Sequence, residues 1–402
     1  MSWDADVTVV GAGAAGLSLA DRLTDPDGPA PAPRVVVVEA PAGPHRAPDR
    51  TWCYWEAGDG PFDDMLTASW ARLRVYGSEG HLVDRTTGPL RYKMLRSQRF
   101  TTVMRQRLRA RGVEVRRMTV DSALDTAGGA EVRGRDAAGQ QSVIRSRWVC
   151  DSRPPPYLPA ARTTLLQHFR GWFVTTLRPA FDPAVPVLMD FRTPQPARGL
   201  SFGYVLPLSP HEALVEYTEF SPSVLSANAY ESAVRHYCDE VLRLGELRVL
   251  SREQGVIPMT DGRFPRRSGR RVLLIGGAGG ATRPSTGYTF AAIQRQTEAL
   301  AGALRTGLPP DGVPAVHGRR ARAMDAVLLR ALDTGRVEGG SFFTRLFSSV
   351  PTERMLRFLD GATTPWEDIG IGMRTPVLPM LLSLVELPLL PRTVPAAVPG
   401  RH

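Results

Sequence analysis

The sequence DVTVVGAGAAGLSLADRL, residues 6–23, contains an apolar run at 7–10, a glycine-rich turn at 11–16 and a helix-like stretch at 17–23. This order of strand, tight turn and helix is typical of the start of a dinucleotide-binding fold. In that fold Gly11 permits the turn, Gly13 lets the backbone approach a pyrophosphate, and Gly16 lets the helix pack closely on its strand. The N-terminus of the helix then faces the phosphates.

A second apolar run, residues 34–38, ends at Glu39. This position is about twenty residues after the last glycine of the turn, where a carboxylate accepts hydrogen bonds from a ribose. The 2′-phosphate of NADP would be repelled by the carboxylate. The sequence therefore predicts that FAD or NAD is the nucleotide held here.

A late segment returns to the same kind of pattern. The run RVLLI at 271–275 leads into GGAGGATRPSTGY at 276–288, and a helical pattern of apolar residues follows until Gly307. A dinucleotide held by one chain often needs the start and the end of that chain to meet over it. We therefore expect the two glycine turns to lie together.

Composition excludes several classes of function. The chain has 402 residues and a formal charge of +10, but Lys93 is its only lysine and the arginines are scattered without a block of five. This is a compositional bias rather than a nucleic-acid footprint, so no nucleic-acid partner is predicted. Cys53, Cys150 and Cys238 are far apart, which predicts a reducing compartment, no disulfide framework and no metal site.

The length exceeds what a single core usually serves, so the sequence predicts an α/β fold with more than one domain. After the nucleotide unit, short β-like runs occupy about 70–148, and four longer runs lie at 172–177, 187–191, 202–206 and 213–220. The expected parts are a Rossmann-type nucleotide domain at 1–160 and 255–310, an inserted antiparallel-sheet substrate domain at 161–254, and a helical C-terminal region at 311–402.

Six motifs, taken in order and spacing, give the chain a family resemblance. It resembles the flavin-dependent lycopene cyclases of bacteria and plants, which share the fold of the flavoprotein aromatic hydroxylases. The resemblance extends from residue 7 to about 304 and makes FAD the expected cofactor. The motifs are GAGAAGLSLA at 11–20, DRTWCYW at 49–55, YKMLRSQRF at 92–100, VCDSRP at 149–154, LVEYT at 214–218 and PSTGYTF at 284–290.

Two positions separate this family from its hydroxylase relatives. The chain has Gly276 and Gly277 where the hydroxylases have a Gly-Asp pair that contacts the ribityl chain, and its LVEYT motif places the family's acid at Glu216. Tyr217 stands where many members carry a second acid, and Arg283 where many have His. These departures put in doubt a two-carboxylate mechanism and a role for His beside the flavin.

Strand periodicity separates the two acids of this segment. In a strand, Glu216 and Glu219 point to opposite faces, so only one of them can face inward. An apolar pocket raises the pKa of a carboxyl group, as a general acid working near neutral pH requires. Glu216 is the predicted catalytic acid, with Glu219 as the alternative.

Further residues are expected at the flavin. Arg50 could clamp the pyrophosphate, since a guanidinium suits phosphate oxygens, or could be one surface arginine among many. The late turn is expected to meet the isoalloxazine ring through Pro284, Thr286, Gly287 and Tyr288.

The resemblance implies a cyclisation of lycopene ends to β-ionone rings without net redox, using reduced FAD and NAD(P)H as external reductant. The alternatives are a flavin monooxygenase or isoprenoid reductase on the same fold, and a non-catalytic carotenoid carrier.

Lycopene is too apolar to cross water, so peripheral contact with the inner face of the cell membrane is expected. No export signal and no transmembrane helix are predicted. The candidate contact residues lie in the C-terminal region: Phe342, Phe343, Leu346 and Phe347, and the apolar run 377–390.

Overall fold

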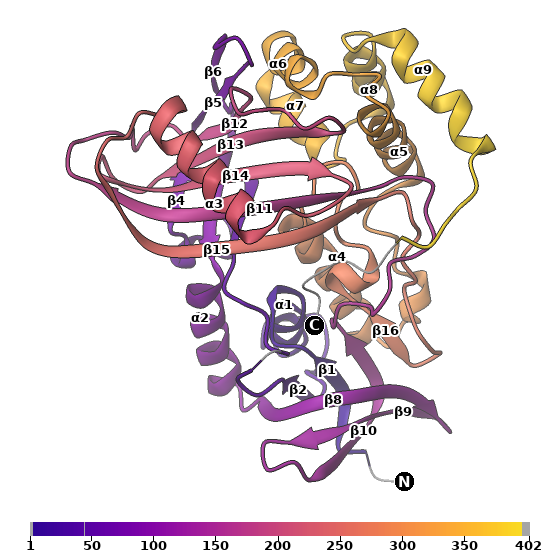
Figure 1. Cartoon of the computed structure of the whole chain (residues 1–402). Helices are drawn as coiled ribbons and strands as arrows, with labels where there is room; N and C mark the ends of the chain where they lie inside the picture. The colour runs from indigo at the N-terminus through magenta and orange to yellow at the C-terminus, as the bar shows by residue number, and fades with distance from the viewer. Residues whose placement is uncertain (1–2, 44, 396–402) are drawn as a thin grey trace.

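The first strand, turn and helix form where the sequence predicts them. In the computed structural model, which describes residues 3–43 and 45–395, β1 (Ala5–Val10) runs into the glycine turn and α1 (Ala14–Leu23) follows. Every valine of β2 (Val35–Glu39) is buried, as expected for a central parallel strand covered on both faces. The unit thus begins the lower of the two large sheets in Figure 1.

That lower sheet has a parallel core in the order β8, β2, β1, β10, β16, and β9 pairs antiparallel with the far ends of β8 and β10. The late strand β16 therefore returns to the sheet that β1 begins, as predicted. The remaining strands are β8 (Glu114–Thr126), β9 (Gly129–Asp136), β10 (Gln141–Asp151) and β16 (Val272–Leu274). Apolar side chains of α1, α2 (Ser97–Ala110) and α4 (Phe290–Arg305) share one core with this sheet.

A seven-stranded sheet lies above it, in the order β15-β11-β14-β13-β12-β5-β6. All its neighbouring strands are antiparallel except β12 and β5, which are parallel. Its strands are β5 (Arg72–Tyr76), β6 (Leu82–Thr86), β11 (Thr164–Thr176), β12 (Val187–Asp190), β13 (Leu200–Pro207), β14 (Glu212–Ser221) and β15 (Leu247–Thr260).

Two features of this sheet differ from the simple division expected from sequence. The boundary expected at residue 254 falls inside β15, which pairs with β11 along its length. The β-like runs expected at about 70–148 are shared between the sheets, because β5 and β6 join the upper one while β8, β9 and β10 join the lower one. A small sheet of β3 (Thr51–Ala57), β7 (Leu90–Arg96) and β4 (Ala68–Trp70) completes this part of the chain.

The two faces of the seven-stranded sheet are covered differently. One face packs on α3 (Ala227–His236), which crosses in front of the sheet in Figure 1, and its core includes Trp172, Val215 and Tyr217. The other face, which includes Phe173 and Leu214, packs on the small sheet and on C-terminal helices. We call these the outer and the inner face.

The C-terminal region is helical, as expected, and residues 396–402 of the expected range lie outside the described residues. Its helices gather beside one end of the upper sheet in Figure 1. They are α5 (Arg319–Asp333), α6 (Gly339–Ser349), α7 (Thr352–Leu359), α8 (Pro365–Gly372) and α9 (Val377–Glu386).

One expectation for this region is wrong. Phe342, Phe343, Leu346 and Phe347 were candidates for a membrane face, but all four are buried in the core that covers the inner face of the sheet. The apolar spacing of α6 serves core packing, which the same periodicity produces.

The helices α8 and α9 are different, because their apolar side chains are exposed. Trp366 is 82% exposed, Leu378 67% and Val385 68%. Within the described residues no single helix passes the length and hydropathy test for a membrane span, and α8 with the segment 377–389 passes it only as a pair bent by 117°.

Candidate active site

The two glycine turns meet, as expected. Gly11 has φ +99°, and a Cβ on Gly16 would overlap the carbonyl oxygen of Gly11, so only glycine lets α1 begin this close to β1. A Cβ on Gly276 would lie 2.9 Å from the Cβ of Ala15. Gly276 and its neighbour Gly277 belong to a short 3-10 turn, so the late segment abuts the start of α1.

Gly13 faces open space, since nothing lies within 4 Å of the position its Cβ would take. It is the residue just before the first turn of α1, whose backbone N–H groups have no partner inside the helix. Such a helix start offers donors and partial positive charge to an anion. The geometry therefore leaves open space at a helix start, at the place where the sequence predicts a pyrophosphate.

Glu39 ends β2 and forms ion pairs with Arg105 and, at 3.5 Å, with Arg46. Its carboxylate is buried at the end of the second parallel strand, in the position expected to receive a ribose.

Arg50 lies at the sheet above. Its backbone N–H donates to Ser97 Oγ at 2.8 Å, and its Nη1 is 2.9 Å from the position that a Cβ of Gly255 would take on β15. Burial lowers the pKa of Arg50 while the nearby charge of Glu253 raises it. The structure thus brings Arg50 beside β15, an edge strand of the upper sheet.

A buried ion pair between Arg283 and Asp325 holds the late turn at 284–288 in place. Arg283 Nη2 and Asp325 Oδ1 on α5 are 3.1 Å apart, and Ser285 Oγ donates to the same oxygen at 2.6 Å. The N–H of Gly287 donates to the carbonyl of Arg283 at 3.0 Å. Arg283 therefore anchors the turn.

Gly287 in this turn lies against Gln167 of β11. A Cβ on Gly287 would overlap the side-chain oxygen of Gln167, and that buried oxygen has no hydrogen-bond partner among the described residues. The hydroxyl of Thr286 donates to the carbonyl of Leu359 at 3.4 Å. Pro284 and Tyr288 complete the turn, in which Gly287 is buried against an unsatisfied polar group.

Glu216 lies on the inner face, as the strand periodicity predicts. Its neighbours in register are Tyr204 on β13 and Gly171 on β11. The hydroxyl of Thr218 donates to its Oε1 at 2.7 Å. Burial, together with the charge of Glu253 on β15, raises the pKa of Glu216 to about 8, although the Thr218 hydrogen bond opposes this. The side chain is therefore protonated at neutral pH, which suits a proton donor.

Aromatic groups connect Glu216 with the late turn. Tyr204 and Tyr92 share a hydrogen bond, and the Trp55 ring meets the Tyr288 ring edge-on at 4.6 Å and lies 6.0 Å from that of Tyr92. Burial raises the pKa of Cys53, between these rings, to about 12. In β3 the side chains alternate, so Trp55 joins this group whereas Trp52 and Tyr54 pack on Phe290 of α4.

Glu219 is not brought together with Glu216. It lies on the outer face, where Tyr217 donates to its Oε2 at 2.9 Å and His168 Nε2 is 3.8 Å from its Oε1. Nδ1 of His168 bonds the Tyr230 hydroxyl at 2.7 Å, and its Nε2 bonds Ser221 at 2.8 Å. Burial lowers the pKa of His168. This cluster is a closed polar network in a packed core.

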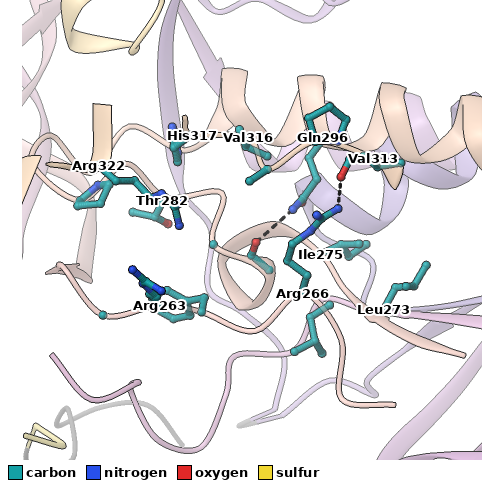
Figure 2. Close-up of a pocket in the computed structure, with 18 of the residues that line it drawn as sticks. Arg263, Arg266, Leu273, Ile275, Thr282, Gln296, Val313, Val316, His317 and Arg322 are labelled. Atoms are coloured by element: carbon teal, nitrogen blue, oxygen red, sulfur yellow. Dashed lines mark hydrogen bonds between the residues drawn. The ribbon is translucent and has the colours of Figure 1, made fainter. Parts of the chain in front are cut away.

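Figure 2 shows a cavity next to the late glycine turn; its volume is about 120 Å³, and Pro284 belongs to its lining. Thr282 and Arg263 line it, and the Gln296 amide donates across it to the carbonyl of Gly279 at 3.4 Å. Neither Glu216 nor Tyr288 belongs to its lining.

Sequence reasoning missed Glu253, Gln167 and Tyr204, which strand pairing over long sequence separations brings to the site and no local motif signals. It also assigned no role to Tyr92, although this residue begins the motif at 92–100. No cluster of three or more potential metal ligands occurs in residues 3–43 and 45–395.

Comparison with known proteins identifies a family for this chain. A family model described as lycopene cyclase protein matches residues 6–385. No curated protein matches the chain.

Several solved structures share the fold. A geranylgeranyl bacteriochlorophyll reductase-like protein from Thermoplasma acidophilum aligns with a TM-score of 0.63 and 11% identity over 95% of this chain and 99% of its own. A flavoprotein/dehydrogenase from Cytophaga hutchinsonii gives 0.61 and 13% over 95% and 98%. The p-nitrophenol 4-monooxygenase of Pseudomonas putida gives 0.56 and 18% over 96% and 98%. These similarities confirm the predicted α/β fold class with its Rossmann-type domain.

Proposed function

The chain belongs to the lycopene cyclase family, and from this premise we propose that it closes the acyclic ends of lycopene into β-ionone rings, giving γ-carotene and β-carotene without net redox. The observation that carries the proposal is Glu216, a buried carboxyl group that keeps its proton at neutral pH beside an aromatic enclosure. An acid that can donate in a dry site is what proton-initiated cyclisation requires.

The residues fit FAD as the cofactor. Gly11, Gly13 and Gly16 would accept the pyrophosphate at the start of α1, Glu39 the ribose, and Gly276 and Gly277 the ribityl side. The unpartnered oxygen of Gln167 and the turn at 284–288 offer polar groups to an isoalloxazine ring. When bound in its reduced form, FAD would supply negative charge beside a developing cation, with NAD(P)H as the external reductant.

Residues of the chain would donate the proton and stabilise the cation. Glu216 would give its proton to the terminal double bond of the substrate, which leaves a tertiary cation. A neighbouring double bond then attacks to form the ring cation, and one proton passes from this cation to the Glu216 carboxylate that the first step leaves, so the numbers of protons and electrons are unchanged. The ring faces of Trp55, Tyr92, Tyr204 and Tyr288 would exclude water and attract the positive charge.

Expression in a lycopene-accumulating host tests the activity. We expect γ-carotene and β-carotene in the separated pigments. With purified enzyme, NAD(P)H consumption should fall far below the number of rings formed. Stoichiometric reductant or oxygen consumption would instead identify a reductase or monooxygenase on this fold.

The cofactor placement has a readout of its own. Gly13→Val should block the pyrophosphate approach and abolish bound flavin in the purified protein. Gly302→Val is a matched control, because nothing lies within 4 Å of its Cβ position either, but it sits within α4. Normal flavin content in Gly13→Val would contradict the placement.

We further propose that α8 and α9 dock on the inner face of the cell membrane. Their exposed apolar side chains lie on two consecutive helices, and Arg374 lies in the turn between them. The last turn of α9 is fixed to the protein, since Glu386 forms ion pairs with Arg330 and Arg336. The surface comprises Trp366, Ile369, Met373, Val377, Leu378, Leu381, Leu382, Leu384, Val385 and Leu389.

Flotation with vesicles containing anionic lipid tests the docking surface. The triple variant Leu378→Glu, Leu382→Glu and Val385→Glu should stay unbound while the native protein floats. Leu124→Glu with Leu177→Glu is the control, since both side chains are exposed elsewhere. Equal flotation of native protein and triple variant, or none for the native protein, would exclude this surface.

A further inference from the structure

Four residues form a row across the inner face of the seven-stranded sheet. Tyr204, Glu216 and Gly171 are in register on β13, β14 and β11, and Gly171 is also in register with Glu253 on β15. Side chains in register on adjacent strands point to the same face. Glu216 and Glu253 are therefore two acids separated only by a glycine.

Because Gly171 has no side chain, a gap remains between Glu216 and Glu253, and both side chains extend toward it. A Cβ on Gly171 would lie 3.3 Å from Oε2 of Glu216 and 3.3 Å from Cγ of Glu253. Burial raises the pKa of both carboxyl groups, and the charge of Glu253 raises that of Glu216 further. The charge on the Glu253 carboxylate therefore disfavours ionisation of Glu216.

Their surroundings decide which of the two keeps the proton. The Thr51 hydroxyl donates to Oε2 of Glu253 at 2.8 Å, and the charges of Arg96 and Arg50 favour its ionised form. Glu216 receives only the Thr218 hydroxyl, and no arginine contributes to its pKa. The negative charge consequently settles on Glu253 and the proton on Glu216.

Other groups facing the pair do not reverse this assignment. The Arg96 guanidinium lies 4.4 Å from the centre of the Phe173 ring on the same face of β11, toward Glu253. Cys53 and the three tyrosines have pKa values raised by burial, so they are neutral near pH 7. The titratable and charged groups around the pair are Arg50, Cys53, Tyr92, Arg96, Tyr204 and Tyr288.

Resting on the proposed role of Glu216 as proton donor, we infer that Glu253 is a positioning residue for that proton: an ionised carboxylate across the Gly171 gap that keeps Glu216 loaded. The adjacent acid that Tyr217 replaces in this chain is thus not needed for a pair, because the second carboxylate comes from β15. Glu253 acts through Glu216 and transfers no proton to the substrate itself.

The test follows the protonation of Glu216 directly. In flavin-loaded protein, the infrared carbonyl band of protonated Glu216 is identified by its loss in Glu216→Gln and titrated with pH. Glu253→Gln removes the like charge and should lower the titration midpoint by about one pH unit. Burial remains, so the midpoint should stay above that of an ordinary glutamate.

Two further variants make the result specific. Thr51→Val removes a hydrogen bond that favours ionised Glu253, so it should also lower the titration midpoint of Glu216, by less than Glu253→Gln does. This variant provides the test if Glu253→Gln does not fold. Glu219→Gln changes the same residue type on the outer face of β14 and should leave the midpoint unchanged.

An unchanged midpoint in folded Glu253→Gln, or an equal shift in Glu219→Gln, would overturn the inference. The infrared titration needs no lycopene, so its outcome is separate from the proposed function. If the native protein formed no β-ionone rings while the midpoint still shifted, the function would fail and the carboxylate pair would stand. In the active enzyme, Glu253→Gln should also lower the pH at which activity falls, whereas a merely structural loss would scale the rate equally at every pH.

Discussion

The two faces of β14 hold two buried glutamates in contrasting surroundings. Glu219 on the outer face accepts from Tyr217 and adjoins a histidine that is itself bonded on both ring nitrogens. Glu216 on the inner face has one hydroxyl donor and a second acid across a glycine gap. They are similarly buried, at 8% and 6% exposure, so burial does not distinguish them.

What distinguishes them is the titratable group beside each carboxyl group, since each accepts a hydrogen bond from one hydroxyl. Glu219 lies beside a histidine, whereas Glu216 lies near a second acid whose charge raises its pKa. Within three residues of one strand, the chain thus places an acid of a packed polar network and the proposed proton donor on opposite faces.

Exchanging each acid for its amide should give the largest contrast. In Glu216→Gln the transferable proton is lost, so cyclisation should fall by about a hundred- to ten-thousandfold, as for a lost acid-base group. Glu219→Gln should keep its turnover per folded molecule and lose stability instead. Product formation and thermal unfolding are measured for both. Inactive Glu219→Gln beside near-normal Glu216→Gln would reverse the assignment.

Filling a glycine on each face should give the next effect. Gly171→Ala places a methyl group between Glu216 and Glu253, and displacement of the donor should cost up to about a hundredfold in turnover. Gly203→Ala forces a methyl group into the Tyr237 ring on the outer face and should lower stability while sparing the rate of the folded enzyme. Equal losses of turnover in both variants would erase the difference between the faces.

The pH dependence of turnover should reflect the protonation of Glu216 on the inner face and not that of Glu219 on the outer face. Because the pKa of Glu216 is raised to about 8, the carboxyl group is protonated and can donate below that pH, and it is ionised and cannot donate above it. Turnover should therefore level off on the acidic side and fall about tenfold per unit on the alkaline side. Steady-state rates between pH 6 and 10 at saturating substrate measure this. A rate that stays flat or rises with pH across this range would mean that the protonated form of Glu216 is not required.

Removing one hydroxyl from each face should give the smallest effects. Tyr217→Phe leaves an oxygen of Glu219 without its donor and should cost about 1–3 kcal/mol in the free energy of unfolding at unchanged activity. Thr218→Val removes the hydrogen bond that favours ionised Glu216, so the alkaline fall in activity should move to higher pH. Denaturant unfolding and the rate profile separate the two. A stability loss in both without a change in the rate profile would refute the distinction.

The local parts of the site were predictable from sequence. The turn at Gly11, the end of β2 at Glu39 and the inward direction of Glu216 depend on short-range rules, namely glycine geometry, motif spacing and strand alternation. The meeting of the two glycine turns also followed, because a late strand and turn of the same type return to the first sheet.

The remaining parts depend on pairing that local sequence does not encode. Glu253 faces Glu216 only because β15 and β14 flank Gly171, and the register across β11 comes from contacts distant in sequence. The misassignment of Phe342 and Phe343 has another cause: an apolar helix face has the same pattern whether it meets a protein core or lipid. Only the packing of α6 on the sheet distinguishes the two.

The late strand β16 also constrains how the protein is made. It lies beside β10 in the sheet that β1 begins, so the ribosome must synthesise residue 274 before that sheet is complete. The upper sheet waits similarly for β15, and its inner face stays uncovered until α6 and α7 emerge. A nascent chain of this kind exposes apolar strand surface for most of its synthesis. We therefore expect a strong dependence on chaperones and on translation rate, and expression at reduced temperature should raise the soluble yield.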